Sequence, residues 1–218
     1  MWPPPRFFPD ARLNFAENVF AFKSPDKIAL IGAREGGTEI EKITYGELQK
    51  RVEQMASAMR NAGIQKGDRI AAIISNSIVS FVICLATLSI GAIWSSSACD
   101  MGASGINDRL IQIRPKIIFA DNGALYNRKI ISQIDKLKQI MATVDSSLLS
   151  NLVIIPRIKT LPSMLDGFAK SITFDDFIKK STGDPLKYEQ VEFNHPAVIV
   201  YSSGTTGKPK CIVHHHGV

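Results

Sequence analysis

The chain has 218 residues, of which 45% are hydrophobic and 21% charged, a composition that supports a buried core and excludes a disordered tail. Its 26 basic and 20 acidic residues give a net charge of +6, but no run of three basic residues occurs. This favours a solvated, mildly basic surface over a nucleic-acid-binding face. The three cysteines lie far apart and form no CxxC pair, which excludes a disulfide framework and a cysteine zinc site and favours a reducing compartment.

The chain carries no sign of a secretory signal, because its first residues lack an apolar stretch. Residues 70–99 contain no charged side chain and would be long enough to span a bilayer if they were continuous. Polar segments at 75–77 and 95–97 interrupt and close this stretch. We therefore favour a buried strand followed by a buried helix, no membrane span, and a cytosolic protein.

Early in the chain, the pattern predicts a hairpin followed by a capped helix. The apolar-rich runs 28–33 and 39–43 flank a segment with a glycine pair, which suits the positive φ angles of a tight turn. Thr44 and Glu47 have the spacing of a capping box, and apolar residues then recur on one helical face. Gly63 is expected to end this helix.

Strand-like and helix-like segments alternate from residue 69 onward. The expected strands are 69–74, 93–94, 116–120 and 152–155, and the expected helices are 77–90, 107–113 and 128–144. A further short helix is expected near 174–179. Such alternation predicts an α/β fold with a mostly parallel sheet and helices on both of its faces.

The last part of the chain combines a buried strand with a polar loop. The strand at 197–201 runs into residues 202–210, which contain four hydroxyls, two glycines and two lysines. Glycines let backbone N–H groups approach an anion, hydroxyls add donors, and a lysine neutralises charge, so we interpret the loop as a phosphate site. An ordinary surface loop is the alternative. After this loop we expect no further strand or helix.

The loop is not a Walker A motif. Two residues separate Gly204 from Gly207, whereas a Walker A motif has four between its glycines. Pro209 follows Lys208 where that motif has serine or threonine, and the proline blocks an immediate helix. The P-loop class of nucleotide-binding proteins is therefore excluded, and an ordinary surface loop stays the alternative to a phosphate site.

Residues 201–210 (Tyr-Ser-Ser-Gly-Thr-Thr-Gly-Lys-Pro-Lys) resemble the phosphate-loop signature of the adenylate-forming superfamily, which includes acyl-CoA synthetases. Residues 7–18 resemble the lead-in shared by acetyl-CoA and acetoacetyl-CoA synthetases. Residues 90–97 and 209–214 are more similar to the acetoacetyl-CoA synthetases. The resemblance covers essentially the entire chain, as the front portion of a longer protein.

This resemblance implies a two-step ligase reaction with ATP, Mg²⁺ and coenzyme A. Acetoacetate and ATP would form an acyl-adenylate and pyrophosphate, and the CoA thiol would then displace AMP to give acetoacetyl-CoA. Acetate or propionate is the alternative acid, and a catalytically inactive, truncated nucleotide-binding or interaction fragment is the alternative from another class. The expected partners are these small molecules, with no nucleic acid, and the sequence leaves the oligomeric state open.

The resemblance also divides the chain. Residues 1–24 would be the lead-in segment, and residues 25–218 an incomplete front part of the large N-terminal AMP-binding domain, without the small C-terminal domain. The adenine and ribose motifs, the hinge, the C-terminal lysine and most of the acyl pocket would lie beyond Val218. We therefore expect this chain alone to be catalytically incomplete, and we assign no catalytic residue within it.

The resemblance places the ATP phosphates on the loop. The expected phosphate-binding residues are Ser202, Ser203, Gly204, Thr205, Thr206, Gly207, Lys208 and Lys210. Lys210 matches the usual lysine of the family and would neutralise charge, whereas Lys208 would at most support it. Arg128 and Lys129, which we expect to begin a helix, match a region that binds the CoA 3′-phosphate in related enzymes, and a solvated pair of cations is the alternative.

Other reactive side chains receive structural interpretations. The consecutive histidines at 214–216 point in different directions and do not form a metal site. Cys99 and Cys211 are expected to be small buried residues. Asp100 and Asp121 are interpreted as cap or turn residues, and nothing in the sequence brings them together.

Overall fold

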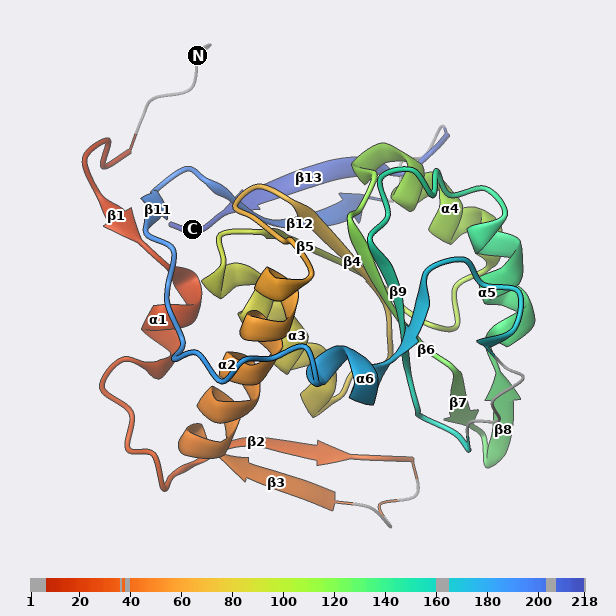
Figure 1. Ribbon diagram of the computed structural model, residues 1–218, viewed down its shortest axis with the longest axis horizontal. Coiled ribbons are helices and arrows are strands. Elements are labelled where there is room, and N and C mark those ends of the chain that lie inside the picture. The colour runs from red at the N-terminus through yellow and green to blue at the C-terminus, as the bar shows by residue number, and fades with distance from the viewer. Residues whose placement is uncertain (1–6, 36, 38–39, 160–164, 203–206, 218) are drawn as a thin grey trace.

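The computed structural model describes residues 7–35, 37, 40–159, 165–202 and 207–217 of the chain. Its centre is a seven-stranded sheet (Figure 1). From one edge to the other, the strands are β10 (Ser171–Thr173), β9 (Asn151–Ile155), β6 (Ile117–Asp121), β4 (Arg69–Ile73), β5 (Ile93–Ser97), β12 (Pro196–Ser202) and β13 (Lys210–His215). The strands from β10 to β12 run parallel, and β13 pairs antiparallel with β12. The predicted α/β fold with a mostly parallel sheet is confirmed.

Helices cover both faces of this sheet, as Figure 1 shows. Ile70 and Ala72 of β4 belong to one core cluster and Ala71 and Ile73 to the other, because neighbouring residues of a strand face opposite sides. The first cluster is built on α2 (Tyr45–Asn61), α3 (Ile78–Ser89) and α6 (Phe174–Ile178), and the second on α4 (Ala103–Ile113) and α5 (Ile134–Met141). β4 therefore lies between two separate apolar layers.

The uncharged segment 70–99 forms β4, α3 and β5, which confirms the expected buried strand and buried helix. Residues 95–97, expected to close the stretch, instead continue β5. Ser77 caps α3, because its side chain accepts a hydrogen bond from the Ser80 N–H at 3.2 Å and the Ser80 hydroxyl accepts one from the Ser77 N–H. Within the described ranges, no helix is long and apolar enough to cross a membrane.

The early hairpin and helix form as predicted. β2 (Ile28–Ala33) pairs antiparallel with β3 (Ile40–Thr44), and α2 begins immediately after it. Thr44 Oγ1 accepts from the Glu47 N–H at 3.2 Å, and the Glu47 carboxylate accepts from the Thr44 N–H at 2.8 Å. Both halves of the capping box are therefore present.

The predicted helix 128–144 is wrong in its first part. This region contains a hairpin of β7 (Gly123–Tyr126) and β8 (Lys129–Ser132), and α5 begins only at Ile134. Asn127 and Arg128 form its two-residue turn with φ angles of 49° and 59°. The Glu35 carboxylate accepts hydrogen bonds from both of their N–H groups, at 2.8 and 2.9 Å. Because Glu35 lies just after β2 and far from the turn in sequence, the local apolar spacing could not predict this contact.

The expectation that no strand follows the polar loop is also wrong, because β13 returns along β12. Cys211 lies on this edge strand and is exposed, which corrects its expected burial. Another pair that the sequence did not reveal joins β1 (Arg12–Leu13) to β11 (Val191–Glu192). β1 and β11 have two residues each, which is too short for a periodic pattern, so the sequence gives no local signal for their pairing.

Asn14 attaches the lead-in to the rest of the fold. Its buried side chain accepts from the Ala16 N–H at 3.0 Å and so caps α1 (Phe15–Phe20). The same amide donates to the carbonyl oxygens of Leu88 and Glu189, each at 2.9 Å. One side chain therefore connects the lead-in, the end of α3 and the segment before β11.

We predict that Asn14→Ala lowers the free energy of unfolding by roughly 2–3 kcal/mol, because it removes a helix cap and the side-chain hydrogen bonds that join the lead-in to Leu88 and Glu189. Urea unfolding measures this change. The matched control is Asn18→Ala, which removes an exposed amide from the same helix and is expected to cost less than about 0.5 kcal/mol. Equal losses in the two variants would contradict the role of Asn14.

Candidate functional site

A cleft of about 930 Å³ lies beyond the carboxyl ends of three neighbouring strands, β4, β5 and β6. After β4 the chain enters α3 on one face of the sheet, whereas after β5 and β6 it enters α4 and α5 on the other. The connections thus leave in opposite directions at β4. In open parallel sheets, ligands bind in the crevice that such a reversal creates.

The cleft has both apolar and polar walls. Phe81, Trp94, Leu125 and Tyr126 contribute large apolar surfaces. Side chains that can form hydrogen bonds also line it: Ser75, Asn76, Ser80, Ser96, Ser97, Ser132, Gln133 and Lys136. Apolar walls with a few hydrogen-bonding groups are typical of small-molecule binding sites.

Lys136 of α5 fixes the wall that follows β5. Its ammonium group donates to the carbonyl oxygen of Cys99 and, at 3.1 Å, to that of Met101. Because a lysine ammonium has three donors, it also retains capacity for a group bound in the cleft. Cys99 is buried, and burial raises the pKa of its thiol, with the nearby charges of Asp121 and Asp100 adding to the effect.

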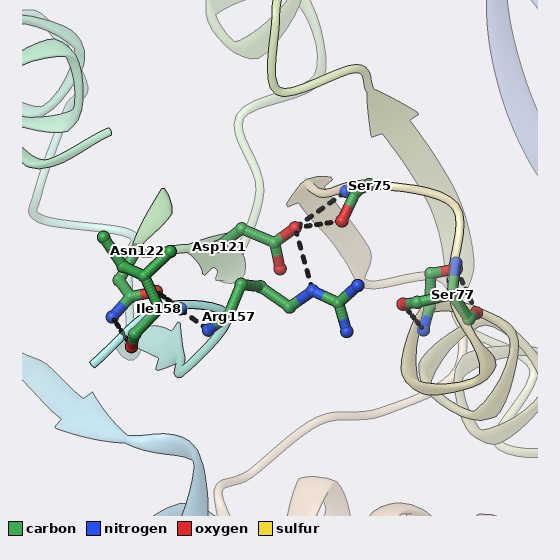
Figure 2. A network of polar contacts seen from close by, with 7 residues as sticks. Ser75, Ser77, Asp121, Asn122, Arg157 and Ile158 are labelled. Atoms are coloured by element: carbon green, nitrogen blue, oxygen red, sulfur yellow. Dashed lines mark hydrogen bonds and ion pairs between the residues drawn. The ribbon is translucent and has the colours of Figure 1, made fainter. Parts of the chain in front are cut away.

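Asp121, the last residue of β6, is the most unusual polar group near the cleft. Its side chain is 0% exposed, and Figure 2 shows it between Ser75 and Arg157. Oδ2 accepts hydrogen bonds from the Ser75 N–H at 2.9 Å and the Ser75 hydroxyl at 2.5 Å, and lies 3.9 Å from Arg157 Nε. Burial raises the pKa of Asp121, while Ser75 and the arginines oppose that shift.

Asn122 extends this network to two further loops. Its side-chain oxygen accepts from the N–H groups of Arg157 and Ile158, at 2.8 and 3.0 Å, and its amide donates to the Ile158 carbonyl (Figure 2). Its own carbonyl accepts from the N–H of Gln133, a cleft residue. The sequence-based interpretation of Asp121 as a cap or turn residue missed this arrangement. An ionisable residue immediately after a buried strand was the available signal.

The expected phosphate loop joins β12 to β13 at the same carboxyl edge. Ser202 and Lys210 lie directly opposite each other in the two strands. Lys208 is exposed and lies 3.8 Å from Asp108 of α4, and the Pro209 carbonyl accepts from the Gln112 side chain at 2.9 Å. Gly207 is described, whereas Ser203, Gly204, Thr205 and Thr206 lie outside the described residues.

Several contacts hold β12 in place. The Tyr201 hydroxyl donates to the Arg109 carbonyl at 3.3 Å, and the Arg109 guanidinium lies 5.1 Å from the centroid of the Tyr201 ring. The Ser95 hydroxyl of β5 donates to the Ile199 carbonyl at 3.0 Å. The strand that leads into the expected phosphate loop is therefore fixed to both α4 and β5.

The structure separates the two groups of expected site residues. Arg128 and Lys129 lie exposed at the tip of the β7–β8 hairpin, which lines the cleft, and not at the start of a helix. Between described residues, no hydrogen bond or ion pair joins this hairpin to β12 or β13. His214 is exposed, whereas His216 is buried and accepts from the Phe15 N–H at 3.1 Å.

Comparison with known proteins identifies the family of this chain. Residues 18–218 match the family model of the AMP-binding enzymes. The chain belongs to the AMP-binding enzyme family. Acetoacetyl-CoA synthetases from Macaca fascicularis and Gallus gallus are each 42% identical to it over 98% of its length. A malonamoyl-CoA synthetase from Penicillium aethiopicum is 39% identical, also over 98% of this chain.

Solved structures agree with the sequence comparison. The structure of an acetoacetyl-CoA synthetase from Streptomyces lividans superposes on 99% of this chain with a TM-score of 0.88 and 32% sequence identity. This chain spans 32% of that protein and 32% of the first two synthetases named above. The resemblance to acetoacetyl-CoA synthetases that the sequence motifs indicated is thereby confirmed.

We predict that a thiol reagent at pH 8 modifies Cys211 at least about tenfold faster than Cys84 or Cys99, because the thiolate is the reactive form. Burial raises the pKa of Cys84 to about 12 and also raises that of Cys99, so both remain protonated, whereas Cys211 is exposed. Mass spectrometry of peptides identifies the first adduct. Cys211→Ser is the control that removes the fast phase, and equally fast labelling of a cleft cysteine would contradict the burial described above.

Proposed function

We propose that this chain contributes the phosphate loop and the cleft of an ATP-dependent acetoacetate–CoA ligase. Acetoacetate attacks the α-phosphate of ATP, which gives acetoacetyl-adenylate and pyrophosphate, and the CoA thiol then displaces AMP. The observation that carries this proposal is the similarity to acetoacetyl-CoA synthetases along 98% of the chain. The position of the loop between the paired strands β12 and β13 supports it, since a phosphate site needs donors held before charge develops.

The loop is proposed to bind the β- and γ-phosphates of ATP. Its glycines and hydroxyls supply hydrogen-bond donors, and Lys210 neutralises the charge that builds on the departing pyrophosphate. Lys208 has a lesser part, because Asp108 lies 3.8 Å from its ammonium group. The hydroxyl oxygens of this loop fit a hard cation carried on phosphate, so Mg²⁺ bound there would shield the phosphate charges.

The cleft is proposed to bind coenzyme A. The pantetheine arm of CoA is a flexible chain with two amides, which matches the mixed apolar and hydrogen-bonding walls. Arg128 and Lys129 at the hairpin tip are proposed to attract the phosphates at the other end of the cofactor, because both cations are exposed beside the cleft.

We further propose that residues 25–218 are part of an adenylation domain, that residues 1–24 are its lead-in, and that the protein acts in the cytosol in ketone-body and lipid metabolism. The free cysteines suit a reducing compartment. The partners in this account are acetoacetate, ATP and CoA.

A second acid is a specific candidate, because one similar protein is a malonamoyl-CoA synthetase. Malonamate is acetoacetate with an amide in place of the terminal methyl ketone, so both acids carry a carbonyl group at the third carbon. A pocket that recognises this carbonyl would accept either acid and would disfavour acetate and propionate, which lack it.

We predict that the intact protein catalyses acid-dependent ATP–pyrophosphate exchange with a kcat/KM for acetoacetate at least about tenfold above that for acetate, since a lost hydrogen bond to substrate costs at least this factor. The measurement compares acetoacetate, malonamate, propionate and acetate under the same conditions. Faster exchange with acetate or propionate would defeat the acetoacetate assignment, and ATP binding without exchange for any acid would favour an inactive nucleotide-binding protein.

We predict that Lys210→Ala slows this exchange by about 100-fold to 1,000-fold, because it removes a positive charge that faces the departing pyrophosphate. Lys208→Ala is the matched control two residues away, and we expect it to stay within about threefold of the unmodified protein. Unchanged exchange in Lys210→Ala, or a larger loss in the control, would contradict the roles given to these lysines.

A further inference from the structure

Asp121 and Asn122 lie where three loops around the cleft meet. Asp121 holds Ser75, which follows β4 and lines the cleft. Asn122 holds the backbone of Arg157 and Ile158 after β9, and its carbonyl holds Gln133 after the β7–β8 hairpin. Two consecutive residues at the end of β6 therefore set the relative positions of loops that come from different strands.

We propose that Asp121 is a positioning residue for the thiol-transfer half of the reaction, in which it holds the Ser75–Asn76 wall and Arg157 in the arrangement that admits CoA. The proposal rests on the ligase function proposed above and adds a residue to it. Asp121 itself contacts no substrate in this account. It acts through Ser75 and Asn76, which line the cleft.

Burial of the Asp121 carboxylate costs free energy, which argues for a role beyond packing. A buried carboxylate loses its hydration, and full compensation needs hydrogen bonds to both oxygens. Oδ2 receives two hydrogen bonds from Ser75, whereas Oδ1 has no hydrogen-bond partner among the described residues. Arg157 is 3.9 Å away and 19% exposed, so it compensates the charge without a close contact. An apolar residue at the end of a buried strand would avoid this cost.

The network is also separate from the phosphate loop. Asp121 contacts the loops after β4 and β9, whereas the segment around Lys208 and Pro209 contacts Asp108 and Gln112 of α4. A change at Asp121 should therefore displace the cleft wall and leave ATP binding in place. Impaired CoA binding with intact ATP binding would therefore indicate a positioning role, because general destabilisation would impair both.

The test is Asp121→Asn in the intact protein, which keeps the shape of the side chain but removes the charge that faces Arg157. We expect the KM for CoA to rise at least about tenfold while acetoacetate-dependent ATP–pyrophosphate exchange stays within about twofold. The matched control is Thr87→Val, which alters a buried hydroxyl on α3 that does not line the cleft. We expect this control to leave the KM for CoA unchanged at a comparable melting temperature.

Two further variants keep the proposal testable if Asp121→Asn does not fold. Ser75→Ala removes one of the two donors to Oδ2, and Arg157→Gln removes the facing cation. Each is expected to raise the KM for CoA by about threefold or more, with exchange nearly unchanged. An unaltered KM for CoA in both variants, or a parallel loss of exchange and thiol transfer in Asp121→Asn, would overturn the positioning role.

A binding measurement separates this inference from the choice of acid. The rise in melting temperature that CoA causes does not depend on which carboxylate is activated. A rise with the unmodified protein that Asp121→Asn lacks would support the positioning role even if acetoacetate failed as substrate. An equal rise in both proteins would overturn the positioning role, and absence of exchange with any acid in the unmodified protein would overturn the proposed function alone.

Discussion

The reversal of the chain at β4 is the constraint on which the rest of the structure depends. β4 pairs with β5 on one side and β6 on the other, and its connection to α3 leaves toward the opposite face from theirs. The connections diverge at this point, and the cleft lies between the loops that follow β4, β5 and β6. The fold thus creates the binding space before any particular side chain is considered.

Two separate polar assemblies lie at the carboxyl edge of the sheet. The proposed phosphate loop joins β12 to β13, and its residues Lys208 and Pro209 contact α4. The cleft is bounded by loops that Asp121 and Asn122 hold together. In the function proposed above, the loop would hold the nucleotide and the cleft would hold the thiol.

The sequence predicted the elements whose signals are local. The capping box of Thr44 and Glu47, the interruption at 75–77 and the apolar runs of the parallel strands all led to correct assignments. It failed where a distant residue decides the conformation, as Glu35 does for the turn at Asn127 and Arg128. For the same reason the loop motif at 202–210 was recognisable, whereas the importance of Asp121 depends on Ser75 and Arg157, which are 46 and 36 residues away along the chain.

Hydrogen–deuterium exchange of the intact protein, measured separately with ATP and with CoA, tests the central division most directly. The account predicts that CoA slows exchange of backbone amides at 75–77, 97–100 and 123–133, whereas ATP slows exchange at 207–213, because each ligand orders the segments that contact it. Protection of 207–213 by CoA with no change around the cleft would contradict the account.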